Sequence, residues 1–236
     1  NTGTSANPYR AEVTVENNGL ENNRALQVSV GNDHTCSIFD DLQLYCWGYN
    51  YYGQLGIGST TQQTRSQVVN MPDNLRVTDI SLGSSHTCAI VNNGSVYCWG
   101  RGDSGQLGDN STINSQVPVY TQLPQGRTAI AISSGATHSC AILDNNSIYC
   151  WGKNNYGQLG IGSTPSYSLL PVFVDMPTSS VPVQLSLGTD FTCTVLNNGS
   201  AYCWGYNSHN QVEGPVDNVQ PSSITSPLYL NLKTNY

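Results

Sequence analysis

The sequence predicts an all-β fold of the β-propeller type, with four blades of about 52 residues each. Three observations support this prediction. The triplet Cys-Trp-Gly recurs four times, at intervals of 52, 52 and 53 residues. Short alternations of apolar and polar residues dominate the chain, whereas few windows have the apolar periodicity of a helix. About four short strands in roughly 50 residues is typical of one propeller blade.

The composition excludes several classes of function. The chain has 236 residues, and its 8 basic and 15 acidic residues give a formal net charge of −7. Such an acidic balance lacks the basic surface that nucleic acid or an anionic membrane requires. No stretch approaches the roughly 18 apolar residues of a membrane-spanning helix. The chain begins at Asn1 rather than Met, so we expect a processed mature chain or an excerpt.

Residues 1–23 form an N-terminal arm that precedes the first full repeat. Residues 11–16 alternate in polarity, with Ala11, Val13 and Val15 on one face. Val15 lies 16 residues before Gly31, and Val119, in the last strand of the second repeat, lies 16 residues before Gly135. The arm therefore resembles the last strand of a missing preceding blade. We expect a donor strand that closes a small ring, belongs to a longer propeller or adds to a neighbouring subunit.

The propeller is expected over residues 24–236, and each repeat should supply four strands. In the second repeat, residues 77–83 alternate and predict the first strand. Residues 88–91 and 95–99 are rich in strand-forming residues and flank Asn-Asn-Gly, which predicts a hairpin. Residues 116–124 follow a glycine-rich turn and predict the last strand. The expected repeats are about 24–75, 76–127, 128–180 and 181–236.

Each repeat contains two cysteines ten positions apart. If they face each other across the hairpin, the loop between the strands has three residues. Opposed residues at a non-hydrogen-bonded site lie about 4.5 Å apart, within reach of a disulfide. Regular disulfides imply an oxidising compartment, so we expect a secreted or cell-surface protein. The predicted pairs are Cys36–Cys46, Cys88–Cys98, Cys140–Cys150 and Cys193–Cys203.

A metal site is the alternative use of these cysteines, because His34, His86 and His138 each lie two residues before the first cysteine. Three features oppose it. The CxxC spacing of structural zinc is absent. The fourth repeat has Phe191 at the histidine position and keeps both cysteines. One histidine and two cysteines also leave the fourth ligand unsupplied. We therefore predict no metal, and a histidine hydrogen-bonded within each blade.

Residues 83–108, GSSHTCAIVNNGSVYCWGRGDSGQLG, resemble the repeat of the regulator of chromosome condensation family. The pattern is Gly, His, an apolar strand, a Gly turn, Trp-Gly and Gly-Gln-Leu-Gly, and it recurs over about residues 24–236. The cysteine-bearing version is similar to the secreted microbial branch. The fourth copy departs at Phe191 and lacks Gly-Gln-Leu-Gly. The resemblance implies a β-propeller, usually of seven blades, without fixing the function.

Family members include a nucleotide-exchange factor that binds chromatin, a role that needs a cytosolic or nuclear setting and charged loops. Four blades shaped for a larger ring would instead leave sheet edges exposed. We therefore expect a non-enzymatic extracellular structural protein, a subunit of a surface or filamentous assembly built by head-to-tail contacts and strand donation. The alternative is a secreted binding module with a carbohydrate or protein ligand, for which the candidate aromatic residues are Tyr49, Tyr51 and Tyr206.

Neither catalysis nor a cofactor is predicted. No nucleophile–base pair stands out, and the acidic residues are scattered. The glycine-rich stretches lack the Gly-Lys-Ser/Thr of a phosphate-binding loop. The repeated tryptophans are expected in the core or between blades.

Two exposed features keep both a structural and a functional interpretation. Glycan acceptor sequons occur at Asn93, Asn110, Asn145 and Asn198, three of them at hairpin centres, where turn chemistry alone would also favour Asn. The sequence Arg101-Gly102-Asp103 spells a cell-adhesion signal. It lies at a variable turn between repeat motifs, so we interpret it as a permissive turn.

Overall fold

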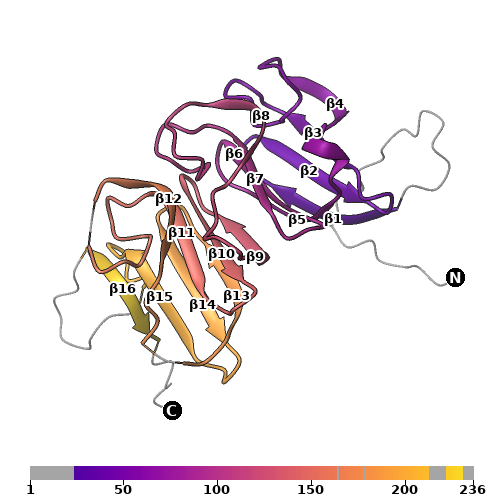
Figure 1. Cartoon of the computed structure of the whole chain (residues 1–236). Helices are drawn as coiled ribbons and strands as arrows, with labels where there is room; N and C mark the ends of the chain where they lie inside the picture. The colour runs from indigo at the N-terminus through magenta and orange to yellow at the C-terminus, as the bar shows by residue number, and fades with distance from the viewer. Residues whose placement is uncertain (1–23, 164, 178, 213–221, 231–236) are drawn as a thin grey trace, which may run out of the picture.

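The computed structural model describes residues 24–163, 165–177, 179–212 and 222–230, and the donor strand expected at 11–16 lies outside them. The described residues form four four-stranded antiparallel sheets (Figure 1). The strands are β1 Ala25–Val30, β2 His34–Phe39, β3 Leu44–Gly48, β4 Gln63–Val68, β5 Val77–Leu82, β6 His86–Val91, β7 Val96–Gly100, β8 Ser115–Tyr120, β9 Ala129–Ser134, β10 His138–Leu143, β11 Ile148–Lys153, β12 Tyr167–Phe173, β13 Pro182–Leu187, β14 Phe191–Leu196, β15 Ala201–Tyr206 and β16 Ser223–Tyr229.

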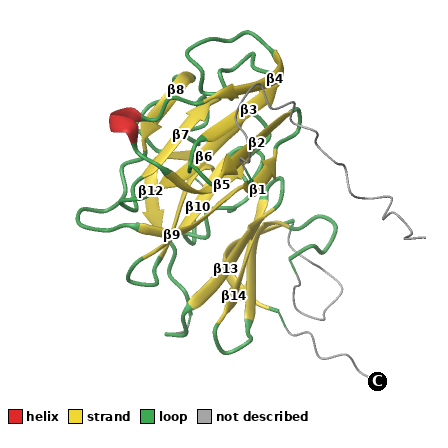
Figure 2. Ribbon diagram, turned by 90° about the vertical axis from the view of Figure 1, so that its right-hand side faces the viewer, coloured by secondary structure: helices red, strands yellow, loops and turns green. Residues whose placement is uncertain are grey.

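Each sheet takes its four strands from one repeat in chain order, and we number these sheets blades 1 to 4. The first strands of the blades, β1, β5, β9 and β13, contact one another in sequence and form the inner side of an arc. Blade 1 and blade 4 lie at the two ends of that arc (Figure 1). The predicted all-β propeller architecture is confirmed, and a short 3₁₀ turn, Pro72–Asn74, interrupts the strands (Figure 2).

The hairpin register in the second repeat agrees with the prediction. Cys88 is paired with Cys98, and Val91 N–H donates to the Ser95 carbonyl at 3.0 Å. The intervening Asn-Asn-Gly turn ends at Gly94, whose φ of 79° lies in the left-handed region that glycine adopts without strain.

The last strands begin and end earlier than the apolar pattern predicts. Strand β8 ends at Tyr120, although apolar alternation continues to Leu123. At Thr121 the chain turns over the end of the blade, where the hydroxyl donates to the Leu107 carbonyl at 2.8 Å. Leu123 then packs into the core instead of continuing the sheet. Apolar alternation therefore extends past the hydrogen-bonded strand.

The apolar core lies between the blades. Each of three clusters combines the tryptophan of one blade with the leucine of Gly-Gln-Leu-Gly from the preceding blade. A blade therefore buries its apolar face against its neighbours, as repeat proteins do. The tryptophan–leucine pairs are Trp99 with Leu55, Trp151 with Leu107, and Trp204 with Leu159, all six of them 0% exposed.

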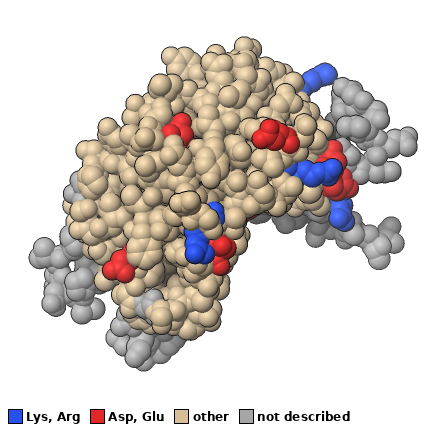
Figure 3. All heavy atoms as spheres, in the orientation of Figure 1, with Lys and Arg blue, Asp and Glu red and all other residues tan. Residues whose placement is uncertain are grey.

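Charged side chains are sparse on the surface. In the view of Figure 3, a few Lys, Arg, Asp and Glu residues are scattered over a largely uncharged face. The described residues contain no helix with the length and apolarity that a membrane crossing needs.

Candidate functional site

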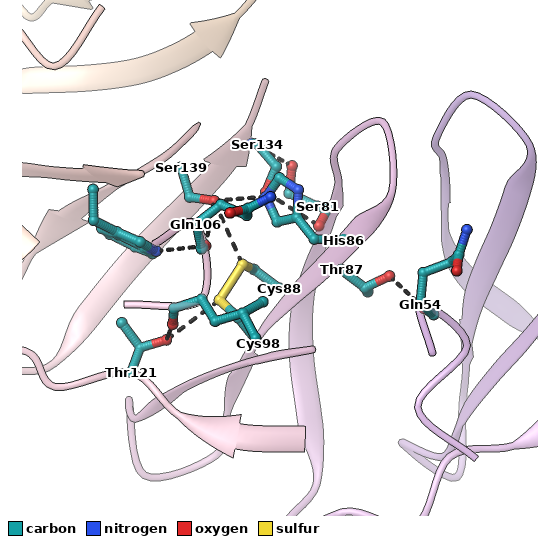
Figure 4. Close-up of a disulfide and its surroundings, with 12 residues drawn as sticks. Gln54, Ser81, His86, Thr87, Cys88, Cys98, Gln106, Thr121, Ser134 and Ser139 are labelled. Carbon is teal, nitrogen blue, oxygen red and sulfur yellow. Dashed lines mark hydrogen bonds between the residues drawn. A yellow bond between two sulfur atoms is a disulfide. The ribbon is translucent and has the colours of Figure 1, made fainter. Parts of the chain in front are cut away.

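The four disulfides form as predicted, one in each hairpin. The paired Cα atoms are 4.1 Å apart in every bond, which is the close spacing of directly opposed residues. Cys88 and Cys98 are fully buried where blade 2 meets blade 3, and the Thr121 hydroxyl lies 3.3 Å from the Cys98 sulfur (Figure 4). The disulfides of blades 1, 2 and 3 thus lie beside the interfaces between blades. Disulfides of this kind indicate an oxidising, extracellular environment.

The repeated histidines connect neighbouring blades, which corrects the expectation of a bond within each blade. His86 Nε2 lies 2.8 Å from the Ser139 hydroxyl of blade 3 (Figure 4). The same contact recurs at the other two interfaces, with His34 and Thr87 2.9 Å apart and His138 and Thr192 2.9 Å apart. The correction has a physical reason: a histidine at the start of the second strand points out of its own sheet.

The partner hydroxyls determine the histidine tautomer. Thr87 Oγ1 donates to the Gln54 carbonyl at 2.9 Å, so its proton is already used. The lone pairs of this oxygen remain free to accept, and His34 must donate through Nε2. Burial lowers the pKa of His34 to about 4. Each interface therefore contains a neutral histidine that donates to a hydroxyl, which donates in turn to a main-chain carbonyl.

The tryptophan of each following blade donates to the same carbonyl. Trp99 Nε1 donates to Gln54 O at 3.0 Å, Trp151 Nε1 to Gln106 O at 2.9 Å, and Trp204 Nε1 to Gln158 O at 2.9 Å. One carbonyl from Gly-Gln-Leu-Gly therefore accepts two bonds from the next blade. This shared acceptor fixes the distance and orientation between neighbouring blades.

Sequence reasoning missed the glutamine and the hydroxyl of this network. A signal was present, because the residue after the histidine position is Thr35, Thr87, Ser139 or Thr192, a hydroxyl in every repeat. Its meaning was hidden because the two partners lie in different repeats, more than 30 residues apart.

The buried Ser139–His86 pair is not arranged for catalysis. Both residues are 0% exposed, so a substrate cannot reach the hydroxyl. His86 Nδ1 is buried without a partner, whereas a catalytic histidine is oriented there by an acid. Burial, with smaller contributions from His34 and His138, lowers the pKa of His86 to about 3, which makes it a weak base. Within the described ranges, no group of three His, Cys, Asp or Glu residues could hold a metal ion.

The three candidate ligand-face aromatics do not form one patch. Tyr49 and Tyr51, in blade 1, stack with ring centroids 6.4 Å apart, and Tyr51 is 67% exposed. Tyr206 belongs to blade 4 and packs against Tyr156, with centroids 4.7 Å apart. The aromatics therefore make two separate patches at the two ends of the arc.

Arg101-Gly102-Asp103 forms a closed turn. Arg101 Nη2 and Asp103 Oδ2 form an ion pair at 2.7 Å, and the guanidinium lies 5.2 Å from the Tyr52 ring centroid. A Cβ at Gly102 would collide with the Ile113 carbonyl, so local packing alone explains the glycine. The two charges that an adhesion receptor would bind are thus paired with each other.

The four sequon asparagines are exposed. Those at the hairpin tips fold into turns: Asn93 Oδ1 accepts from Ser95 N at 2.9 Å, and Asn198 Oδ1 accepts from Ser200 N at 2.9 Å. This turn chemistry accounts for Asn at the tips. Glycans on Asn93, Asn110, Asn145 and Asn198 stay a prediction.

A shallow groove of about 220 Å³ follows the inner side of the arc. It is lined by the residues that follow the first strands, including one glycine from each blade. A Cβ at Gly83 would collide with the His86 ring, so the glycine permits the histidine to reach the next blade. The lining residues are uncharged, and the groove offers main-chain groups and small side chains rather than acid–base chemistry.

Known proteins share this architecture. The profile described as RCC1-like domain matches residues 2–233. The ultraviolet-B receptor UVR8 of Arabidopsis thaliana is 29% identical over 194 residues, covering 82% of this chain and 44% of the receptor. The human E3 ubiquitin-protein ligase HERC2 is 30% identical over 194 residues, covering 81% of this chain and 4% of the ligase.

Solved structures agree in fold. Yeast RCC1 (Prp20), in a complex with Kap60, superposes with a TM-score of 0.80 at 20% identity, over 90% of this chain and 51% of that one. Human WBSCR16 superposes with a TM-score of 0.73 at 22% identity, over 88% and 52%. The chain spans about half the length of these structures and 44% or less of the two relatives in sequence.

Proposed function

The chain belongs to the RCC1-like domain family, and from that premise we propose that it is a non-enzymatic extracellular structural module that assembles head to tail with copies of itself. One observation carries this proposal. The interface between blades occurs three times among the described residues, and within them blades 1 and 4 each have one half of it without a partner blade. A module with two different open halves can form rings or filaments.

The surface and the cross-links support an extracellular setting. Each described blade has one disulfide, between its second and third strands. The chain has 10% charged residues, against about 25% for an average soluble protein, so few charges have to be desolvated when two copies meet. The absence of catalysis remains part of the proposal, and it is supported by the burial of the repeated histidine–hydroxyl pairs.

Strand donation by residues 11–16 is a second, separate contribution to assembly in this proposal. Each described sheet already has four strands of its own repeat, so no strand position is vacant within them. A donated strand would therefore add to an open sheet edge.

Particle imaging of the native material, together with sedimentation velocity over a range of concentrations, tests the proposal. Rings, filaments or concentration-dependent oligomers are the expected result, and a monomer at every concentration would contradict it. Deleting residues 1–23 separates the two contributions: assembly that survives the deletion does not depend on the arm.

A carbohydrate- or protein-binding module is the second candidate. The observation in its favour is the exposed Tyr49–Tyr51 stack, because aromatic faces stack on sugars. A glycan array with alanine variants of Tyr49, Tyr51 and Tyr206 tests it. Binding that is lost with Tyr51→Ala would support this function over assembly.

A further inference from the structure

Among the described blades, blade 1 exposes the face with which each later blade packs on its predecessor. Val28 and Val30 of β1 are 61% and 66% exposed. The corresponding residues of β5, Ile80 and Leu82, are 3% and 6% exposed, because they pack on blade 1. We call Val28, Val30, Thr35 and Trp47 the leading face of blade 1.

The leading face keeps the hydrogen-bond donors of an internal interface. Trp47 and Thr35 are half-buried, whereas Trp99 and Thr87, at the same positions in blade 2, are fully buried and donate to Gln54 O. In the part of the chain that the structure describes, no carbonyl is bonded to the Trp47 indole. The leading face thus has the donors for a carbonyl of the Gly-Gln-Leu-Gly type.

Blade 4 presents such a carbonyl on its opposite, outward side. Its loop at 207–212 folds like the internal loops: Val212 N–H donates to Asn207 Oδ1 at 2.8 Å, and His209 N–H donates to Gln211 Oε1 at 2.9 Å. The two equivalent bonds in blade 1 are 2.9 and 3.0 Å long. Gln211 therefore occupies the position from which Gln54 O accepts bonds from the next blade.

The apolar part of this side of blade 4 is open as well. Val195 is 38% exposed, whereas its equivalents Ile38, Ile90 and Ile142 are 2%, 4% and 1% exposed. We call Phe191, Val195, Ala201 and Gln211 the trailing face of blade 4.

A polar pairing connects the two faces. Asp190 accepts from Gln158 Nε2 at 3.0 Å, whereas the Nε2 atoms of Gln54 and Gln106 are buried without a partner. Asp33 is the blade 1 equivalent of Asp190. The main-chain carbonyl of each aspartate accepts a 2.8 Å hydrogen bond from the N–H of the residue that follows Trp-Gly in its own blade. The same position holds Ser or Thr in blades 2 and 3, so blade 1 alone offers a second such carboxylate.

We infer that the leading face of blade 1 in one copy docks on the trailing face of blade 4 in a second copy, continuing the series of internal interfaces. In this junction the Trp47 indole and the Thr35 hydroxyl donate to the Gln211 carbonyl. Asp33 accepts from the Gln211 side-chain amide, as Asp190 does from Gln158. This inference rests on the proposed head-to-tail assembly and identifies the two surfaces that meet in it.

The junction is weaker than an internal interface. Phe191 replaces the histidine that would donate to Thr35, and Ala201 replaces Leu44, Val96 or Ile148. Both changes remove contacts, so the assembly is reversible. The described parts of two copies together supply eight blades, within the typical range of about four to eight for a propeller, so a closed ring of two is one permitted product and a filament is the other.

Sedimentation velocity of the full chain and its Val30→Glu variant is the first test. A carboxylate in the apolar contact should weaken association at least tenfold and leave the thermal unfolding of the monomer unchanged, because this side chain is 66% exposed. Ile130→Glu is the matched control: Ile130 is 58% exposed on β9, away from both end faces, and its variant should associate normally.

The second test strengthens the contact. Phe191→His combined with Ala201→Ile restores the residues of internal blades and should tighten association about tenfold or more. Adding Thr35→Val should more than cancel the gain from the histidine, because this hydroxyl is both the acceptor for the histidine and a donor to the Gln211 carbonyl.

The outcomes separate the two proposals. Association that is unchanged by Val30→Glu and by the double variant would overturn this junction and leave self-assembly standing. Association that is lost on deletion of residues 1–23 but kept in Val30→Glu would assign the contact to the donated strand. If the wild type stays a monomer at every concentration, the proposed function itself is wrong, whatever the double variant does.

Discussion

Blades 1 and 2 have nearly the same sequence pattern on their leading faces, yet the two faces have opposite environments. Trp99 of blade 2 is 0% exposed and donates to Gln54 O, whereas Trp47 of blade 1 is half-buried. Val28 and Val30 are more than half exposed, whereas Ile80 and Leu82 are buried. The difference arises from the neighbour, because blade 2 packs on blade 1 and blade 1 has no described blade before it.

The comparison shows that a single propeller blade cannot satisfy all of its hydrogen-bonding and apolar side chains by itself. Its disulfide and its hairpin form within one repeat, but its tryptophan, histidine and hydroxyl are satisfied across the boundary to another. Stability is then a sum over interfaces as much as over blades. An end blade keeps residues whose contribution to stability depends on finding a partner.

The largest expected effect is the contrast between the two tryptophans. Trp99→Ala should lower the free energy of unfolding by about 3–5 kcal/mol, because it leaves a cavity between blades 1 and 2 and removes the bond to Gln54 O. Trp47→Ala should cost less than about 1 kcal/mol in dilute protein. Denaturant titration monitored by far-ultraviolet circular dichroism measures both.

Equal losses in the two variants would break the comparison. They would mean that Trp47 is already covered in the monomer. If the loss of unfolding free energy in Trp47→Ala grows with protein concentration, the contrast between the two tryptophans becomes sharper, because association is then the source of that stability.

The next effect is a destabilisation by acid that arises from the buried histidines of blades 1, 2 and 3 and has no equivalent at Phe191 in blade 4. Burial lowers the pKa of His86 to about 3, and burial also lowers that of His138 to about 3. Unfolded histidine titrates near 6.5, so the unfolded state binds more protons between these values. Stability should be full above pH 6.5 and fall as pH decreases, by up to about 1.4 kcal/mol per pH unit for each histidine.

His86→Phe copies blade 4, where Phe191 lies over Gly188 as His86 lies over Gly83. At pH 7 the variant should lose about 1 kcal/mol, because Ser139 loses one bond and keeps its bond to Gln106 O. Its acid slope should be shallower, so near pH 4 it should be more stable than the wild type. Thermal unfolding from pH 4 to pH 8 measures the crossover, and parallel curves would show that His86 does not titrate on unfolding.

Much of the fold followed from local patterns. The hairpin register and the disulfides could be predicted because Cys88 and Cys98 lie in one hairpin, where the turn sets the pairing. The end of β8 could not be predicted, because the apolar residues beyond Tyr120 continue the same alternation although they pack in the core between blades.

The network between blades was predicted least well. The histidine was recognised as structural, but its partner was placed in the wrong blade. The bond from His86 to Ser139 spans 53 residues, and no local spacing marks it. A repeat shows which positions matter, whereas the packing of one repeat on the next shows what they contact.

The smallest expected effect again compares blades 1 and 2, at the tips of their hairpins. Leu42 and Gly94 end equivalent turns with φ of 59° and 79°. A side chain at positive φ costs about 1–2 kcal/mol, so Leu42→Gly should stabilise blade 1 by up to about 1 kcal/mol after the lost leucine contacts. That corresponds to a rise of roughly 2–4 °C in Tm. Gly94→Ala should have the opposite sign, because its Cβ would also collide with Thr128. If Leu42→Gly lowers Tm instead, the partly buried leucine stabilises the tip more than its backbone strain destabilises it.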